Sequence, residues 1–199
     1  MNLMVKWSGS RSKRFNLGEM ILKKIIKQYE LLFIVVTIIL IADQVTKGIV
    51  RNNIPFGEQW MPVEWLAPYF RFVNWNNTGA AFGLFQNGGP VFGIMAVIVS
   101  GFIIYYFPQV PRENKWMRIA LAMQMAGALG NLIDRLRFGP VTDFISIGNF
   151  AVFNVADSSI TVGVGILILA MWMEERKEKL RAQEEAQVSE ESDAIEKQT

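Results

Sequence analysis

The chain has 199 residues, of which 51% are hydrophobic and 19% are charged, and its formal net charge is +2. It contains no histidine and no cysteine, which excludes Ser-His-Asp and Cys-His catalysis, zinc sites built on those residues, and disulfides. The small net charge and the lack of a basic stripe with interleaved aromatic residues argue against nucleic-acid binding.

The first 28 residues form a basic extension ahead of the first apolar segment. The pattern of Phe15–Gln28 predicts an amphipathic helix that lies on the inner membrane surface. The apolar segment that follows is too long for a secretory signal peptide, and no small-x-small cleavage site follows it. We therefore expect residues 1–28 to be a cytoplasmic extension.

Four later segments approach the roughly 20 apolar residues that a bilayer core demands. The stretch from Phe72 to Pro111 contains no charged residue, which no globular surface could tolerate. The predicted spans are 29–50, 90–108, 116–134 and 154–173. The third is rich in Ala, Gly and Met, as expected of a helix that packs closely against others. The sequence thus predicts an all-α membrane protein with a bundle of four transmembrane helices, and residues 29–173 as its membrane domain.

The distribution of Lys and Arg predicts the orientation of the spans. Fifteen of the 20 basic residues lie in the N-terminal extension, in the 109–118 segment and in the tail from residue 174. Because cytoplasmic segments carry the excess of basic residues, both termini are predicted to be cytoplasmic. The tail, 174–199, is predicted to be helical at first and then disordered.

The loop between the first two predicted spans, 51–89, is the longest segment outside the membrane. Its stretch Tyr69–Trp75 alternates large apolar and polar residues, which predicts a strand or hairpin. Trp60 and Trp65 nearby fit an interfacial aromatic belt. We expect a small extracytoplasmic β element here, on the membrane surface.

Ionisable residues gather at the outer ends of the predicted spans. Asp43 and Lys47 are four residues apart near the end of the first span, a spacing typical of an ion pair. Asp134 and Arg135 lie at the exit of the third span and point in different directions on a helix, so each needs a partner from elsewhere. Structural and substrate-orienting roles both remain open for these two residues.

Asp143, in the loop between the last two spans, and Asp157, at the start of the fourth, have no basic neighbour at helical spacing. If they approach each other, repulsion leaves one protonated and one ionised at neutral pH, as in aspartic proteases. Such a pair can activate water without a metal, a histidine or a cysteine. A proton relay and a structural pairing are the alternatives.

Two other functions are compatible with parts of the sequence. A small proton- or ion-coupled transporter or channel subunit could use the same acids, but the inner halves of the second and fourth spans offer almost no polar residues for a path. A Ser/Lys protease could use Lys47 with Ser158 or Ser159. Asp43, one turn away, would keep that lysine charged and unfit as a base.

Five motifs in order carry a resemblance to a known family. They are Asp43-Gln44-Val45-Thr46-Lys47, Asn77-Thr78-Gly79-Ala80-Ala81-Phe82, Gly130-Asn131-Leu132-Ile133-Asp134-Arg135, Val141-Thr142-Asp143-Phe144 and Phe153-Asn154-Val155-Ala156-Asp157. With these motifs the chain resembles the bacterial signal peptidase II family, over roughly residues 30 to 173.

The resemblance implies an aspartyl endopeptidase in the bacterial cytoplasmic membrane that removes signal peptides from prolipoproteins, cutting before a diacylglyceryl-modified cysteine. It implies that Asp143 and Asp157 are catalytic, and that the substrate site is lined by Asn77, Asn131, Arg135 and Asn154. Gly79 beside them leaves room for a substrate backbone. Asp43, Lys47 and Asp134 are expected to be structural. We expect a monomer among membrane lipids, with its active site at the outer face and no metal or cofactor.

Overall fold

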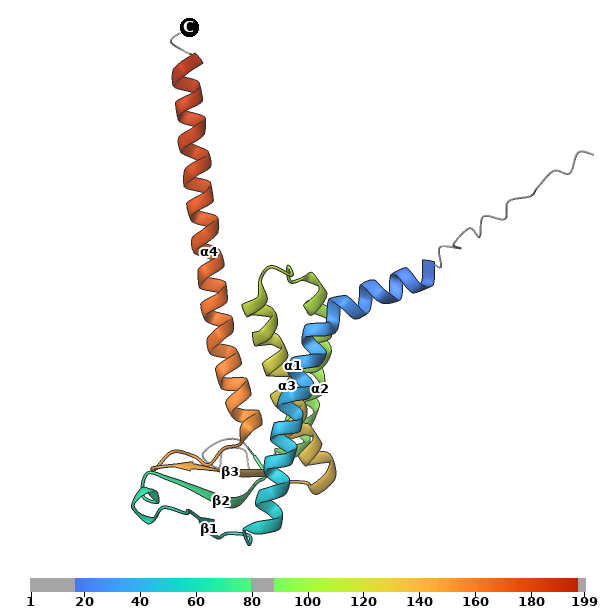
Figure 1. Cartoon of the computed structure of the whole chain (residues 1–199), viewed down its shortest axis with the longest axis vertical. Coiled ribbons are helices and arrows are strands. Elements are labelled where there is room, and N and C mark those ends of the chain that lie inside the picture. The colour runs from blue at the N-terminus through green and yellow to red at the C-terminus, as the bar shows by residue number, and fades with distance from the viewer. Residues whose placement is uncertain (1–16, 80–87, 197–199) are drawn as a thin grey trace, which may run out of the picture.

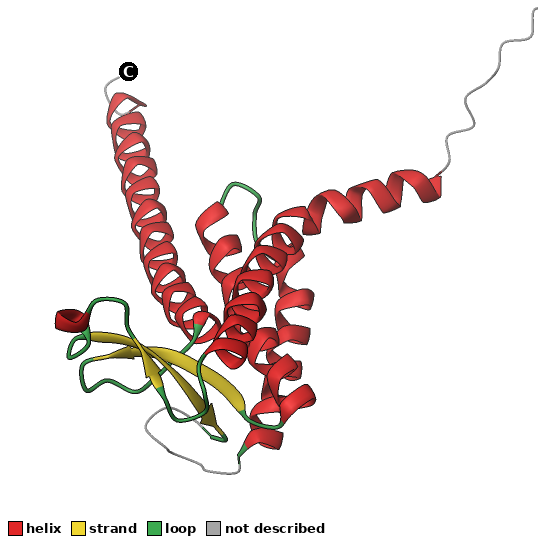
Figure 2. Cartoon of the chain, turned by 60° about the horizontal axis from the view of Figure 1, so that its bottom comes forward, coloured by secondary structure: helices red, strands yellow, loops and turns green. Residues whose placement is uncertain are grey.

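The computed structural model describes residues 17–79 and 88–196. These residues form a bundle of helices with a small sheet across one end (Figures 1 and 2). The helices are α1 (Leu17–Asn53), α2 (Gly89–Tyr106), α3 (Lys115–Phe138) and α4 (Val155–Glu196). Within the described residues, two single 3-10 turns, η1 (Glu64–Leu66) and η3 (Phe107–Gln109), lie in the connections.

Helix α3 is the centre of the bundle, because it packs against α1, α2 and α4. Its residues Ala120, Ala122 and Ala126 have no exposed surface. Small side chains let neighbouring helices approach closely, which suits a helix that is surrounded on several sides.

The surface of the bundle is apolar, whereas charged side chains lie inside it. Phe33 and Ile38 on α1, Phe102 on α2 and Ile168 on α4 are each about 60% exposed or more. This distribution is the reverse of that in a water-soluble protein. Within the described residues, three helical stretches are long and apolar enough to cross a membrane: Gly18–Asn53, Gly89–Gln109 and Val155–Gln187. The chain is therefore a multi-pass membrane protein.

The predicted spans correspond to helices, but three rather than four meet these criteria of length and apolarity. The predicted third span, 116–134, falls within α3, which carries buried polar residues and is shielded by the other helices. Helix α4 also continues as far as Glu196, so the tail is helical at first, as expected, and its described later part is helical where we expected disorder. Its many Glu, Lys, Arg and Ala residues favour helix, and Lys179 pairs with Glu175 at 2.6 Å.

The sheet has three antiparallel strands in the order β1 (Gln59–Trp60), β2 (Phe70–Asn77) and β3 (Val141–Ile147). The strand predicted near Tyr69–Trp75 is present as β2. The prediction was wrong in confining the β element to the segment between the first two spans, since β3 comes from the loop between the last two. Asp143 consequently lies in a strand opposite Trp75 rather than in a loop. The sequence Val141–Ile147 is rich in β-branched residues, which favour a strand.

The buried face of α1 changes character along its length. Leu32 and Val36 belong to an apolar cluster at the end away from the sheet, and Val50 and Ile54 pack on Phe144 at the sheet end. Between these two clusters, Asp43 and Lys47 occupy the same buried face. The apolar clusters fix α1 on both sides of a polar layer.

Gly127 determines how closely α3 and α4 approach. A Cβ at Gly127 would lie 2.3 Å from the Ala156 carbonyl oxygen, which belongs to the backbone. We expect Gly127→Ala to lower the free energy of unfolding by about 1–3 kcal/mol, because the two helices must separate. Thermal unfolding in detergent measures this loss. Gly101→Ala in α2 is the control, since nothing lies within 4 Å of its Cβ position; an equal effect of both substitutions would contradict the close contact.

Candidate active site

The polar layer at the sheet end brings together residues from five parts of the chain. Helix α1 supplies Asp43 and Lys47, and α3 supplies Asn131 and Asp134. The remaining members are Asn77 at the end of β2, Asp143 in β3, and Asn154 and Asp157 around the start of α4. Asp43, Lys47, Asp134 and Asn154 have no exposed surface, and Asp143 is 1% exposed. The carboxylates of Asp43, Asp134, Asp143 and Asp157, which we predicted to gather at the ends of the spans, therefore lie in one layer.

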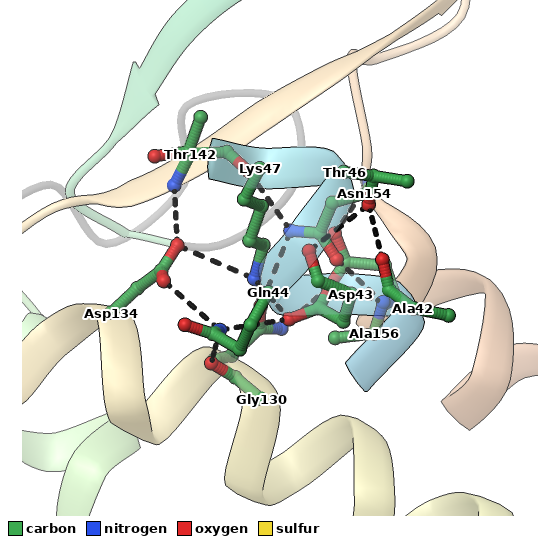
Figure 3. A network of polar contacts seen from close by, with 12 residues as sticks. Ala42, Asp43, Gln44, Thr46, Lys47, Gly130, Asp134, Thr142, Asn154 and Ala156 are labelled. Carbon is green, nitrogen blue, oxygen red and sulfur yellow. Dashed lines mark hydrogen bonds and ion pairs between the residues drawn. The ribbon is translucent and has the colours of Figure 1, made fainter. Parts of the chain in front are cut away.

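A buried ion cluster lies at the base of this layer (Figure 3). The Lys47 ammonium is 2.9 Å from Asp43 Oδ2 and 3.3 Å from Asp134 Oδ2. Arg51 Nη1 lies 3.7 Å from Asp134 Oδ1. The predicted ion pair between Asp43 and Lys47 is confirmed, whereas the partner of Asp134 could not be found from spacing along one helix.

The two carboxylates of the ion cluster also bind the backbone of the elements that carry the other two aspartates. Asp43 Oδ1 accepts a hydrogen bond from the Ala156 N–H at 2.9 Å, in the first turn of α4. Asp134 Oδ2 accepts one from the Thr142 N–H at 3.0 Å, in β3. The ion cluster therefore fixes the backbone beside Asp157 and beside Asp143.

Asp157 is held by a reciprocal cap at the start of α4. Its N–H donates to Asn154 Oδ1 at 2.9 Å, and its Oδ2 accepts from the Asn154 N–H at 3.2 Å. This is the geometry of a capping box, and an N-x-x-D pattern before an apolar run is its sequence signal. Asp157 Oδ1 accepts from Asn131 Nδ2 at 2.8 Å. Both oxygens of Asp157 are thus bound by protein donors.

Asp143 is bound in the same way from two sides. Asn77 Nδ2 donates to its Oδ2 at 2.9 Å, and Asn154 Nδ2 donates to its Oδ1 at 2.7 Å. Burial, together with the negative charge of Asp157, raises the pKa of the Asp143 carboxyl to about 7. Asn154 links the two aspartates directly, since its side chain binds Asp143 while its backbone and Oδ1 cap Asp157.

Three asparagine side chains are held with their carbonyl oxygens turned away from the aspartates. Asn77 Oδ1 accepts from the Gly79 N–H at 2.9 Å, Asn131 Oδ1 accepts from Lys47 Nζ at 3.0 Å, and Asn154 Oδ1 accepts from the Asp157 N–H. Backbone N–H groups and ammonium groups only donate, so each contact specifies which way its amide points. The N–H₂ group of each asparagine therefore faces a carboxylate.

The other predicted residues have less direct roles in this arrangement. Arg135 is half-buried, donates to the Asn131 carbonyl oxygen at 3.5 Å and lies 5.4 Å from the centre of the Phe92 ring. Ser158 and Ser159 both donate to main-chain carbonyl oxygens. The ammonium of Lys47 is bound to two carboxylates, so a Ser/Lys catalytic pair has no support in the geometry.

The residues of this layer do not form a recognisable metal site. Within residues 17–79 and 88–196 no group of three or more His, Cys, Asp or Glu side chains is arranged to hold an ion. The oxygens of Asp143 and Asp157 face amide N–H donors, which compete with any cation for the same lone pairs.

Comparison with known proteins agrees with this geometry. The family described as Signal peptidase (SPase) II matches residues 35–173. A lipoprotein signal peptidase of Shouchella clausii is 38% identical, over 74% of this chain and 96% of its own. That of Staphylococcus carnosus is 34% identical, over 75% of this chain and 94% of its own.

A solved structure titled as a bacterial membrane enzyme, determined by the in meso method, superimposes with a TM-score of 0.67. It is 32% identical and covers 72% of this chain and 88% of its own. The family match contains all of the polar layer and leaves the basic N-terminal extension and the charged tail outside. The chain belongs to the signal peptidase II family.

Proposed function

We propose that Asp143 and Asp157 are the catalytic pair with which this signal peptidase cleaves prolipoproteins before the diacylglyceryl-modified cysteine. The observation that carries the proposal is the position of Asn154, which binds Asp143 through its side chain and caps Asp157 through a reciprocal pair of hydrogen bonds. One residue thereby holds two buried carboxyl groups of different elements beside each other. No cofactor is required for the chemistry that such a pair performs.

The pair hydrolyses a peptide bond if it holds one proton. The ionised carboxylate removes a proton from water as the water oxygen attacks the scissile carbonyl carbon, and the protonated carboxyl donates its proton to the carbonyl oxygen. When the tetrahedral intermediate collapses, the C–N bond breaks and the leaving nitrogen receives the proton that was taken from water. The proton that was donated to the carbonyl oxygen returns to the carboxyl group that donated it. The raised pKa of Asp143 supports a single shared proton near neutral pH.

The polar groups around the pair are suited to an extended substrate backbone. Asn77, Asn131 and Asn154 present amides, Arg135 presents a guanidinium, and Gly79 adds no side-chain bulk. Amide and guanidinium groups bind peptide carbonyls without selecting side chains. Specificity would come from the small residues before the cysteine and from its two acyl chains, which lie against apolar helix faces.

Asp43, Lys47 and Asp134 have a structural role in this proposal. Lys47 lies between two carboxylates and donates to Asn131, and the two carboxylates accept backbone N–H groups of α4 and β3. A buried charge with no partner is strongly destabilising, so the three residues function as one unit.

The proposed topology has four spans. Three are the apolar helices α1, α2 and α4, and we count α3 as a span too because these three helices surround it. The start of α1 and the end of α4 lie away from the sheet (Figure 1). Residues 17–28 contain three lysines, and residues 174–181, directly after the last predicted span, contain four basic residues. We place both termini in the cytoplasm and the sheet, with the active site, at the outer face of the cytoplasmic membrane. Residues 29–173 form the catalytic domain between a cytoplasmic extension and a cytoplasmic tail. A single chain supplies every residue of the pair, which supports a monomer among lipids.

The pH dependence of cleavage tests the shared proton. A carboxyl with a raised pKa keeps its proton below about pH 7 and loses it above, so at higher pH both aspartates are charged and no acid remains. We expect kcat/KM for a lipidated prolipoprotein to fall above about pH 7, approaching about tenfold per pH unit.

The same assay includes two controls. Thermal unfolding across the pH range separates loss of the fold from loss of the proton, and an excess of chelator tests for a metal. A rate that stays constant up to about pH 9 would contradict the shared proton. Loss of cleavage in chelator, restored by a divalent cation, would contradict catalysis by carboxyl groups alone.

A further inference from the structure

The first helical turns of α1, Gly18–Gln28, form an amphipathic segment. Ile21, Leu22, Ile25 and Ile26 follow the spacing i, i+1, i+4, i+5 and share one face, whereas Lys23, Lys24 and Lys27 lie on the opposite face. Met20 is the one large apolar residue on the lysine side. Side chains from Gly18 to Lys27 are exposed, including Ile21 at 52% and Ile26 at 58%. Nothing in the described chain covers this apolar face.

The amphipathic segment is anchored where it joins the bundle. Gln28 Nε2 donates to the Pro108 carbonyl oxygen at 2.8 Å, the Tyr29 hydroxyl donates to the Ile104 carbonyl oxygen at 3.0 Å, and Arg118 donates to the Gln28 carbonyl oxygen. The Tyr29 ring also stacks on Phe107, with centroids 6.0 Å apart. These contacts tie α1 to the end of α2, to η3 and to the start of α3, at the end of the bundle away from the sheet.

Beyond the junction at Gln28 and Tyr29, the amphipathic segment turns away from the axis of the bundle (Figure 1). Tyr29 follows Leu22 by seven residues and Ile25 by four, so it continues their apolar face into the packed junction. The apolar face is also continuous along the chain with the exposed apolar surface of the first span, where Phe33 is 68% exposed and Ile34 is 50% exposed. The apolar face of the segment and the apolar surface of the first span can therefore both contact lipid acyl chains.

The positive charge of the amphipathic segment indicates which kind of surface it can bind. Residues 17–28 contain three lysines and one glutamate, and residues 1–16 add four more basic residues and no acidic one. An apolar face next to a membrane span, opposite a lysine face, fits the boundary between acyl chains and negatively charged headgroups. A protein groove would not require the lysines, and a second copy of the segment would repel them.

We propose that Gly18–Gln28 is a membrane-surface anchor that binds anionic phospholipid headgroups, with Ile21, Leu22, Ile25 and Ile26 embedded below them. The anchor would hold the inner end of α1 at a fixed depth through the junction at Gln28 and Tyr29. This role is independent of peptide-bond cleavage, and it can be measured without substrate.

The absence of cysteine makes the full-length chain suitable for single-site labelling. Ile25→Cys and Lys24→Cys are each spin-labelled and reconstituted in nanodiscs of phosphatidylglycerol with phosphatidylcholine, or of phosphatidylcholine alone. Collision with a water-soluble nickel complex and with oxygen reports the depth of each label. Ile38→Cys, within the first span, is the control for a lipid-embedded position, since Ile38 is 62% exposed on the bundle.

In anionic nanodiscs we expect the label at Ile25→Cys to be protected from nickel like the one at Ile38→Cys, and the label at Lys24→Cys to be several-fold more accessible. Protection at Ile25→Cys should decrease in phosphatidylcholine alone, and also when Lys23 and Lys27 are both changed to Gln. Equal nickel access at positions 24 and 25 in anionic nanodiscs would overturn the anchor. Equal protection in both lipid compositions would overturn the recognition of anionic headgroups.

Discussion

Asp143→Asn and Asp157→Asn should each lower kcat for a lipidated prolipoprotein at least about 1,000-fold, because each carboxyl transfers a proton that an amide cannot transfer. The double variant should be no slower than either single variant, since the two groups act in one step. An amide has nearly the shape of the carboxyl group, so binding of the substrate should change less than kcat. Single-turnover kinetics with purified protein measures both quantities.

The folded state of these variants must be checked independently. Glu64→Gln, a matched removal of an exposed carboxyl in η1, should leave the rate unchanged. Each active-site variant removes a buried carboxyl group but places an amide N–H₂ group against a protein N–H donor, so thermal unfolding must show that the variant is folded at the assay temperature. Turnover near the wild-type rate in either variant would exclude the assigned pair.

Lys47→Met should be the most destabilising single substitution in the polar layer. It leaves Asp43 and Asp134 buried with their shared cation removed, and breaking a buried ion pair in this way costs about 3–5 kcal/mol. Asn131 also loses the donor that orients its amide toward Asp157. We expect a large decrease in unfolding temperature and the loss of cleavage.

A charge-balanced variant separates these two effects. In Asp43→Asn combined with Lys47→Met, one carboxylate and the ammonium are removed together, and Arg51 still lies 3.7 Å from Asp134. Most of the stability should return, while kcat should stay at least about tenfold low because the Asn131 amide can rotate. Full activity in the double variant would show that Lys47 serves stability alone.

The sequence was sufficient to place the residues of the site but not to show how they are oriented. The direction of each span brought Asp43, Asp134, Asp143 and Asp157 to one face, and the structure places them in one layer. Lys47 and Asp134 are 87 positions apart and lie in different helices, so no periodicity within one helix predicts their contact. The direction of the Asn131 amide depends on a second contact of Lys47, the hydrogen bond from its Nζ to Asn131 Oδ1 at 3.0 Å.

The β3 strand and the character of α3 show two other limits of the sequence pattern. The β-branched residues of Val141–Ile147 favour a strand, but the segment itself does not specify that it pairs with β2, which is a tertiary contact. Helix α3 carries polar and small residues, which lower its hydropathy below that of the apolar stretches of the other three helices. It tolerates these residues because α1, α2 and α4 pack around it.

Cleavage of a lipidated and an unlipidated prolipoprotein, compared in the same bilayer, tests the central claim most directly. Each buried methylene is worth about 0.8 kcal/mol against water, but the acyl chains already lie in lipid, so lipidation should act through placement of the scissile bond. Mass spectrometry of the product identifies its first residue. We expect a product that begins at the modified cysteine and a much higher kcat/KM for the lipidated substrate. Equal kcat/KM values for the two substrates, or a cut at another bond, would contradict the account.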